Sequence, residues 1–205
     1  MGRRKTYDRD VLIERAMLLF WQFGYDGTSI AALTEHLGVN KFGLYAEFGS
    51  KQDLYLAALQ RYADTVVGAH FGRLETATSG LEDITAVLGF FATEPEPEPI
   101  RLGCMVCNAA TERAAHDMMS ATQIADYVKR LTAAHQNALR NADRDGQLLP
   151  GTDVSGQAAL LVTQLLGIFV LRRSQSDPTV WRHAGEQAQR QVNALRRNPA
   201  GCATG

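Results

Sequence analysis

The side chains with the most reactive chemistry in this chain are two cysteines in the segment RLGCMVCNAATE, Cys104 and Cys107. Thiols three residues apart on a helix share a face, with side chains roughly 5 to 6 Å apart, near enough for a disulfide after a modest distortion. Cys104 is also expected near the N-terminus of its helix, where the dipole lowers a thiol pKa. Cys104 is therefore a candidate reactive thiol, unless both cysteines are small apolar core residues.

The sequence lacks the residue patterns that support metal binding or catalysis. A single Cys-x-x-Cys without a second pair or a nearby histidine is a weak zinc signal. The five histidines follow no ligand spacing such as His-Glu-x-x-His, and the chain contains no glycine-rich phosphate loop. We therefore expect no enzyme activity, no metal and no cofactor.

A second informative stretch is VNKFGLYAEFGSKQDLY, residues 39–55. Asn40 is a good N-cap for a helix of barely two turns, which cannot be stable by itself. The preceding Gly38 permits a tight turn after another short helix, and Val39 fills the core between the two. This is a helix-turn-helix pattern, in which Leu44 and Phe48 pack inward while the rest of the short helix is offered to the major groove of DNA.

Helical periodicity runs through almost every segment, and no segment alternates convincingly as a strand. We predict an all-α protein with about nine helices, over residues 9–24, 29–37, 41–46, 51–66, 81–92, 102–114, 117–144, 154–173 and 178–196. The segment EPEPEP, residues 94–99, favours a solvated extended loop. Residues 1–50 form the predicted helix-turn-helix domain, 51–197 a second helical domain, and 198–205 a disordered tail.

Charge and hydropathy restrict the possible partners. A formal net charge of −1 argues against attraction of the whole surface to nucleic acid, so such a role must rest on a local patch. Arg3, Arg4 and Lys5 form a basic arm that either reaches DNA or is a solvated terminus. The longest apolar run, residues 158–171, falls short of the ~20 residues of a membrane span. With an odd number of cysteines and no secretory h-region, we expect a cytoplasmic protein without membrane contact.

The segment RAMLLFWQFGYDGTSIAALTEHLGVNKFGLYAEFGSKQDLYLAAL closely resembles the DNA-binding segment of the TetR family of transcriptional regulators. The likeness covers about the first 60 residues without a gap, and it includes Phe-Gly-Tyr before Thr-Ser, Leu-Gly-Val, Leu-Tyr-x-x-Phe and Ser-Lys-x-x-Leu. The remaining chain matches the family in helix number and pattern more than in motif. The resemblance implies a transcriptional regulator, most often a repressor, that binds a palindromic double-stranded DNA operator.

The resemblance also assigns roles to single residues of the DNA-binding segment. Thr28, Tyr45 and Lys51 are expected to contact phosphates, the last with help from the positive end of its helix. The expected base-edge positions follow the cap Asn40, and they are Lys41, Phe42, Gly43 and Leu44. Lys41 can donate to guanine O6 and N7, Phe42 can touch a thymine methyl, and Gly43 lets the backbone come close. Ala46 and Glu47 depart from the family pattern, and we expect Glu47 to point away from DNA.

The resemblance implies a homodimer and a pocket for an unidentified small-molecule effector in the second half of the chain. The last two helices carry the expected dimer interface, namely Leu161, Leu165, Phe169 and Trp181, unless these residues only complete the monomer core. The expected sensor residues are Cys104 and Cys107, with Tyr62, Phe91 and Tyr127 as candidate pocket walls. Some members of the family respond to oxidants or electrophiles through a cysteine.

Two other classes of protein, an enzyme and a helical ligand-binding or scaffold protein, are the alternatives to a DNA-binding regulator. An enzyme would need a cluster of acid, base or nucleophile that the sequence does not show. A helical ligand-binding or scaffold protein would not need the basic arm, the helix-turn-helix and the capped fourth helix together. A DNA-binding regulator explains all three features.

Overall fold

The structure is a computed structural model that describes residues 8–93, 102–174 and 176–197. The predicted basic arm, the segment EPEPEP and the predicted disordered tail lie outside these residues. The chain forms two compact units, the first made of Met1–Thr65 and Leu102–Tyr127, the second of Val66–Arg101 and Val128–Gly205. The predicted boundary after residue 50 does not coincide with an edge of either unit.

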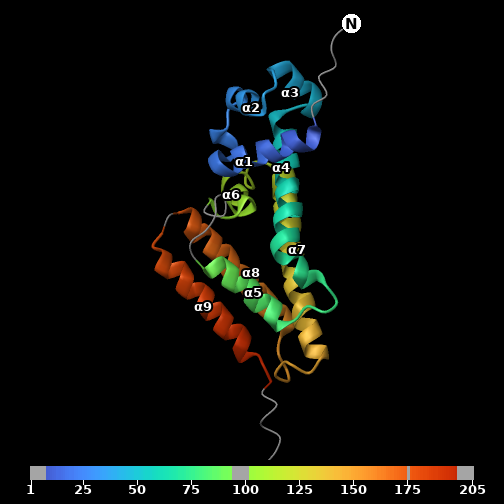
Figure 1. The fold of residues 1–205 in the computed structure, drawn as a ribbon, viewed down its shortest axis with the longest axis vertical. Coiled ribbons are helices and arrows are strands. Elements are labelled where there is room, and N and C mark those ends of the chain that lie inside the picture. The colour runs from blue at the N-terminus through green and yellow to red at the C-terminus, as the bar shows by residue number, and fades with distance from the viewer. Residues whose placement is uncertain (1–7, 94–101, 175, 198–205) are drawn as a thin grey trace, which may run out of the picture. The chain divides into compact units, whose positions relative to one another are not determined.

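Within the described residues, the regular structure is helical apart from one isolated bridge between Leu148 and Arg196. This confirms the all-α prediction (Figure 1). The helices are α1 (Arg9–Gly27), α2 (Ile30–Leu37), α3 (Lys41–Phe48), α4 (Lys51–Val66), α5 (Leu81–Ala92), α6 (Met105–Glu112), α7 (Met118–Arg144), α8 (Val154–Arg173) and α9 (Pro178–Ala194). A π-helical turn, Val67–Phe71, and a 3-10 turn, Gly72–Glu75, follow α4.

Helices α1, α2 and α3, which we call the head, are held by local caps and a small shared core (Figure 1). The Ser29 side chain accepts from the Ala32 N–H at 3.0 Å and starts α2. Gly38 ends it with a φ of 69°, a left-handed conformation that favours glycine. The Asn40 side chain then accepts from the Gly43 N–H at 2.7 Å, so only three residues separate the end of α2 from the start of α3. The turn is therefore tight because a left-handed glycine and two caps occur together.

In the second unit, α9 packs along both α5 and α8 (Figure 1). Gly185 of α9 permits a close approach to α5, because a Cβ at that position would lie 2.3 Å from the Ala92 Cβ. By length and composition α8 could also cross a membrane, a test that core helices of soluble proteins pass as well. Its buried side instead packs against α5 and α9.

The residues predicted as the dimer interface are buried inside the second unit of a single chain. Leu161, Leu165, Phe169 and Trp181 are all less than 5% exposed. Phe169 packs edge-on against Phe91 of α5, with ring centroids 4.8 Å apart. The assignment of these four side chains to a partner surface is therefore wrong, because they complete the monomer core.

Truncation of one of these core residues should destabilise the single chain. We expect Leu161→Ala to lower the free energy of unfolding by about 2–5 kcal/mol, because it leaves a cavity at a fully buried site. The matched control is Leu149→Ala, which truncates an exposed leucine and should cost less than about 0.5 kcal/mol. Urea unfolding of both variants at equal protein concentration measures the difference, and equal midpoints would contradict the assignment of Leu161 to the core.

Candidate nucleic-acid interface and thiol site

Helix α3 presents one face to the core of the head and the other to solvent. Leu44 is fully buried, so its predicted place at base edges is wrong, and it packs in the core instead. Phe42 is 83% exposed, and Lys41 is exposed beside it. The Lys41 Nζ lies 5.9 Å from the ring centroid of Tyr45, which is itself exposed. The exposed face of α3 thus combines a donor cation, two aromatic rings and the small Gly43.

The start of α2 differs from the prediction. Thr28 is 1% exposed, and its hydroxyl donates to the Gly24 carbonyl at 2.6 Å. A hydroxyl in that position cannot reach a phosphate, so the predicted role of Thr28 is wrong. The Thr28 hydroxyl instead stabilises the last turn of α1. Ser29, the exposed N-cap of α2, is the neighbouring hydroxyl at the surface.

Glu47 is the acidic residue on α3 that would repel DNA, and an arginine from α1 balances its charge. The Arg9 Nε lies 3.5 Å from the Glu47 carboxylate. The Arg9 guanidinium also lies 5.2 Å from the ring centroid of Phe48. The pair is exposed, so it contributes little to stability, yet it places a positive charge beside the one carboxylate of α3.

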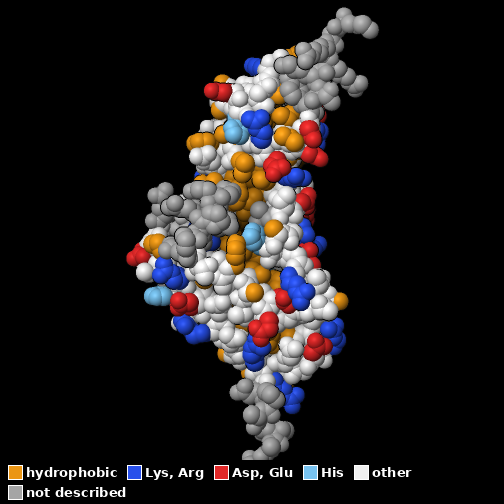
Figure 2. All heavy atoms as spheres, viewed as in Figure 1, with side chains coloured by type: hydrophobic (Ala, Val, Ile, Leu, Met, Phe, Trp, Pro, Cys, Tyr) orange, Lys and Arg blue, Asp and Glu red, His pale blue; other side chains and the backbone are white. Residues whose placement is uncertain are grey.

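Acidic and basic side chains are interspersed on the face shown in Figure 2. This distribution agrees with the net charge of −1. On this face, attraction to a nucleic acid must therefore come from a few local cations instead of a broad positive field.

Lys51, the first residue of α4, is only partly exposed. Its Nζ lies 4.1 Å from the ring centroid of Tyr25 in the last turn of α1. Partial burial lowers the pKa of Lys51, Asp26 opposes this effect, and Arg113 adds to it. The predicted phosphate contact is thus held against an aromatic ring and does not extend freely into solvent.

The two cysteines lie at the start of α6, which is shorter than the predicted helix 102–114. Cys104 is the N-cap and is fully buried, whereas Cys107 is partly exposed in the first turn. Both thiols are free. The Cys104 Sγ lies 3.4 Å from the Tyr127 Oη, within hydrogen-bonding distance.

The surroundings of Cys104 favour its thiolate. Burial opposes ionisation, but hydrogen bonds from Cys107, Tyr127 and Tyr62 outweigh it and lower the pKa of Cys104 to about 6. The hydrogen bond to Cys104 and burial raise the pKa of Cys107. Within the pair, the surroundings thus favour ionisation of Cys104 at the helix start over ionisation of Cys107 one turn later.

The three predicted pocket-wall aromatics belong to two different units. Tyr62 and Tyr127 lie in the first unit, with ring centroids 6.5 Å apart, and Tyr62 also packs edge-on against Trp21. Phe91 belongs to the second unit, where it stacks on Phe71 at 5.7 Å. The tyrosines instead surround Cys104.

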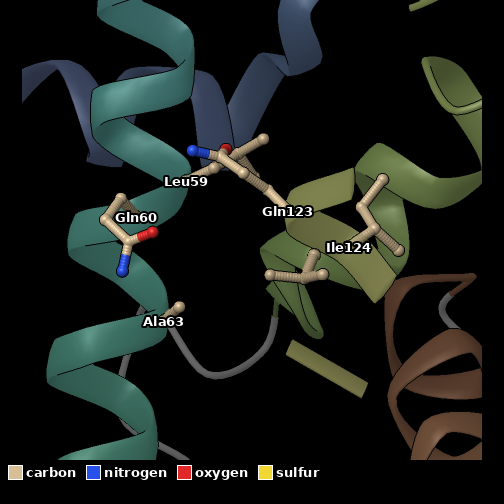
Figure 3. A pocket seen from close by; sticks show the side chains of 6 residues that line it. Leu59, Gln60, Ala63, Gln123 and Ile124 are labelled. Carbon is tan, nitrogen blue, oxygen red and sulfur yellow. The ribbon is translucent and has the colours of Figure 1, made fainter. Parts of the chain in front are cut away.

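A small cavity in the first unit lies between α4, α6 and α7 (Figure 3). It has a volume of about 10 Å³, which suffices for about one water molecule. Its lining residues are Leu59, Gln60, Ala63, Val106, Gln123 and Ile124. Gln123 donates to the Leu56 carbonyl at 3.3 Å, and its own buried Oε1 has no partner among the described residues. The predicted wall residues do not line this cavity.

Three residues near Glu47 and Lys51 were not predicted from the sequence. Arg9 offsets Glu47, and Tyr25 and Arg113 surround Lys51. Arg113 follows α6, far along the chain from the head, and no motif links it to Lys51. Only the Phe-Gly-Tyr sequence pointed to Tyr25, because a glycine inside a helical pattern can indicate a change in backbone direction.

Residues 12–58 match the family described as bacterial regulatory proteins, tetR family. Residues 80–188 match the tetracyclin repressor-like C-terminal domain. The uncharacterised HTH-type transcriptional regulator YezE of Bacillus subtilis is 32% identical over 180 residues, which cover 86% of this chain and 92% of YezE. The HTH-type transcriptional repressor ComR of Escherichia coli is 32% identical over 181 residues, 84% of this chain and 82% of ComR.

Among solved structures, the TetR family regulator CifR, a cysteine mutant in complex with 26-bp double-strand operator DNA, has a TM-score of 0.78. It is 28% identical, and the match covers 92% of this chain and 98% of CifR. The two family matches together span the head and most of the remaining helices. The chain therefore belongs to the TetR family of DNA-binding transcriptional regulators.

Proposed function

We propose that this protein is a dimeric repressor that inserts α3 of each head into the major groove of a palindromic operator. The observation that carries the proposal is the exposed face of α3, which sets Lys41, Phe42 and Tyr45 outward over a buried Leu44. The relative ComR is named a repressor, and CifR is bound to operator DNA in its structure. Repression is the outcome we propose.

Contacts to bases and contacts to phosphates fall to different residues. Lys41 reads guanine O6 and N7, and Phe42 meets a thymine methyl, since both side chains project from the first turn of α3. Gly43 allows a close approach of the backbone, and Asn40 fixes the start of the helix. Tyr45 and Lys51 hold phosphates and set the register without reading sequence. Arg3, Arg4 and Lys5 add non-specific contacts.

The dimer surface that we propose is the exposed stripe of α8 and not its buried side. The exposed residues recur every three or four positions and carry no charge, namely Gly156, Ala159, Leu160, Thr163, Gly167 and Val170. A Cβ at Gly167 would meet no atom within 4 Å in the single chain, so this glycine leaves room for a partner helix. A two-fold dimer on this stripe would match a two-fold operator.

We propose a small-molecule or thiol-reactive signal as the releasing effector, with Cys104 as the reactive group. The support is the lowered pKa of Cys104 at the start of α6, together with the hydrogen-bonding distance to Tyr127. An electrophile such as an α,β-unsaturated carbonyl compound would add to the Cys104 thiolate: a carbon–sulfur bond forms, the carbon–carbon π bond breaks, and the α carbon takes up a proton. An oxidant such as diamide would accept two electrons and two protons while Cys104 and Cys107 form a disulfide. Either product is larger or more strained than the packed thiol, so α6 must shift.

Substitution of Lys41 and of Lys51 should distinguish base recognition from phosphate binding. Lys41→Ala should relax sequence preference, because it removes a donor to a base edge. Lys51→Ala should weaken binding to all sequences alike and reduce the slope of log K against log salt by about one unit. Mobility shifts at several salt concentrations measure both effects. Lys129→Ala, which removes an exposed lysine of α7, is the matched control. Parent-like binding by both Lys41→Ala and Lys51→Ala would refute the assignment.

A charge on the α8 stripe should dissociate the dimer. Leu160→Glu buries an unpaired carboxylate in the proposed interface, so we expect a monomer at micromolar concentration. Leu149→Glu is the matched control, because Leu149 is 45% exposed and Leu160 is 44% exposed in the single chain. Light scattering distinguishes the two, and a dimeric Leu160→Glu variant, or a monomeric parent, would count against this surface.

If Cys104 is the sensor, release of the operator should depend on its sulfur. Cys202, the third cysteine of the chain, is first replaced by serine in every protein compared. Diamide or an electrophile should then release the operator from Cys202→Ser but not from the double variant Cys202→Ser, Cys104→Ser. Because the pKa of Cys104 is lowered to about 6, the rate of modification should rise up to about pH 7 and then level off. A rate that still rises steeply above pH 8, or release by Cys104→Ser, would exclude Cys104 as the sensor.

A further inference from the structure

Two cations from distant parts of the first unit meet at one aromatic ring. The Lys51 Nζ lies 4.1 Å from the ring centroid of Tyr25, and the Arg113 guanidinium carbon lies 4.2 Å from the same centroid. Lys51 starts α4, whereas Arg113 is the C-cap of α6. A ring that attracts two cations joins the helices that carry them.

The end of α1 is shaped to bring Tyr25 to this place. Gly24 has a φ of 73° inside the helix, so the backbone changes direction immediately before Tyr25. A Cβ at Gly24 would lie 2.4 Å from a carboxylate oxygen of Glu112, the last residue of α6. The glycine therefore serves both the turn and the close approach of α6. Tyr25 also packs edge-on against Tyr55 of α4, with centroids 5.0 Å apart.

The other contacts of Arg113 are weak. Its Nη1 lies 3.9 Å from the carboxylate of Asp26, the limit of an ion pair, and the Asp26 side chain is 79% exposed. The Arg113 Nε is buried and has no hydrogen-bond partner among the described residues. The Tyr25 ring, whose centroid lies 4.2 Å from the guanidinium carbon, is thus an important contact of this side chain besides the weak pair with Asp26.

Electrostatics work against this arrangement in the absence of a further anion. Partial burial disfavours the ammonium of Lys51, and the positive charge of Arg113 disfavours it further, so the pKa of Lys51 is lowered. Asp26 compensates only in part. A phosphate beside Lys51 would supply the missing negative charge.

We propose that Arg113 is a positioning residue for DNA binding: it fixes the Tyr25 ring, and the ring holds Lys51 in place for a phosphate. This inference rests on the proposed phosphate contact of Lys51. It extends the binding apparatus beyond the head to the end of α6. The first unit also links the start of α6 to α1, because the Trp21 indole donates to the Gly103 carbonyl at 3.0 Å. A shift of α6 would then act on Lys51 through Arg113.

A double-mutant cycle on operator affinity tests the proposal. Arg113→Met removes the charge but keeps an apolar side chain of similar length. It should weaken operator binding about three- to tenfold, the cost of ordering one freed side chain. In a Lys51→Ala background the same substitution should have no further effect, because the contact that it positions is gone. Arg113→Lys should restore most of the affinity.

Further variants separate positioning from other roles. Tyr25→Leu removes the ring and should reproduce the effect of Arg113→Met without adding to it, whereas Tyr25→Phe keeps the ring and should bind like the parent. Arg140→Met, at an exposed arginine of α7, controls for the loss of one positive charge. Thermal unfolding of each variant detects a change in stability.

Three results would overturn the inference. An equal loss in the Lys51 and Lys51→Ala backgrounds would mean that Arg113 either binds DNA itself or only stabilises the fold. Parent-like affinity of Arg113→Met would mean that the ring holds Lys51 without it. Parent-like affinity and salt slope of Lys51→Ala would instead remove the proposed Lys51 contact itself, a failure that the cycle identifies separately.

Discussion

An eight-residue helix is too short to be stable alone in water, and most of the first unit can be understood from this constraint. Helix α3 must be fixed from one side while its other side remains open. The Asn40 cap starts it, and Leu44 and Phe48 anchor it in the core. Helices α1 and α2 supply that core, and α4 follows at once through Gly49 and Ser50. The exposed side chains of α3 are therefore held in place, although the helix contributes little stability of its own.

A second constraint is charge. A chain of net charge −1 cannot rely on a general attraction to a polyanion, so the placement of single cations near α3 matters. Arg9 lies beside Glu47, and Lys41 and Lys51 each lie near an aromatic ring. Rings orient cations without neutralising them. This arrangement holds the two lysine side chains in place for an anionic partner.

Local patterns in the sequence predicted the helices well, because caps, glycine stops and helical periodicity act within a few residues. Burial was harder to predict. The apolar side chains of α8 occur on both sides of the helix, so hydropathy did not show that Leu161 and Leu165 face inward while Leu160 faces outward. The role predicted for Thr28 was wrong for a similar reason. Its hydroxyl donates a hydrogen bond to the Gly24 carbonyl at a kink that helical periodicity does not reveal. The meeting of Tyr25, Lys51 and Arg113 requires tertiary packing, which a single sequence does not encode in any short motif.

The central claim is that α3 reads the major groove at two symmetric half-sites. Methylation interference on an operator fragment recovered with the purified protein tests it most directly, because dimethyl sulfate modifies guanine N7 in the major groove and adenine N3 in the minor groove. The account predicts that binding is lost when guanine N7 is methylated at symmetric positions in two half-sites about one helical turn or a multiple of it apart. Interference confined to adenine N3, or to one half of the site, would contradict it.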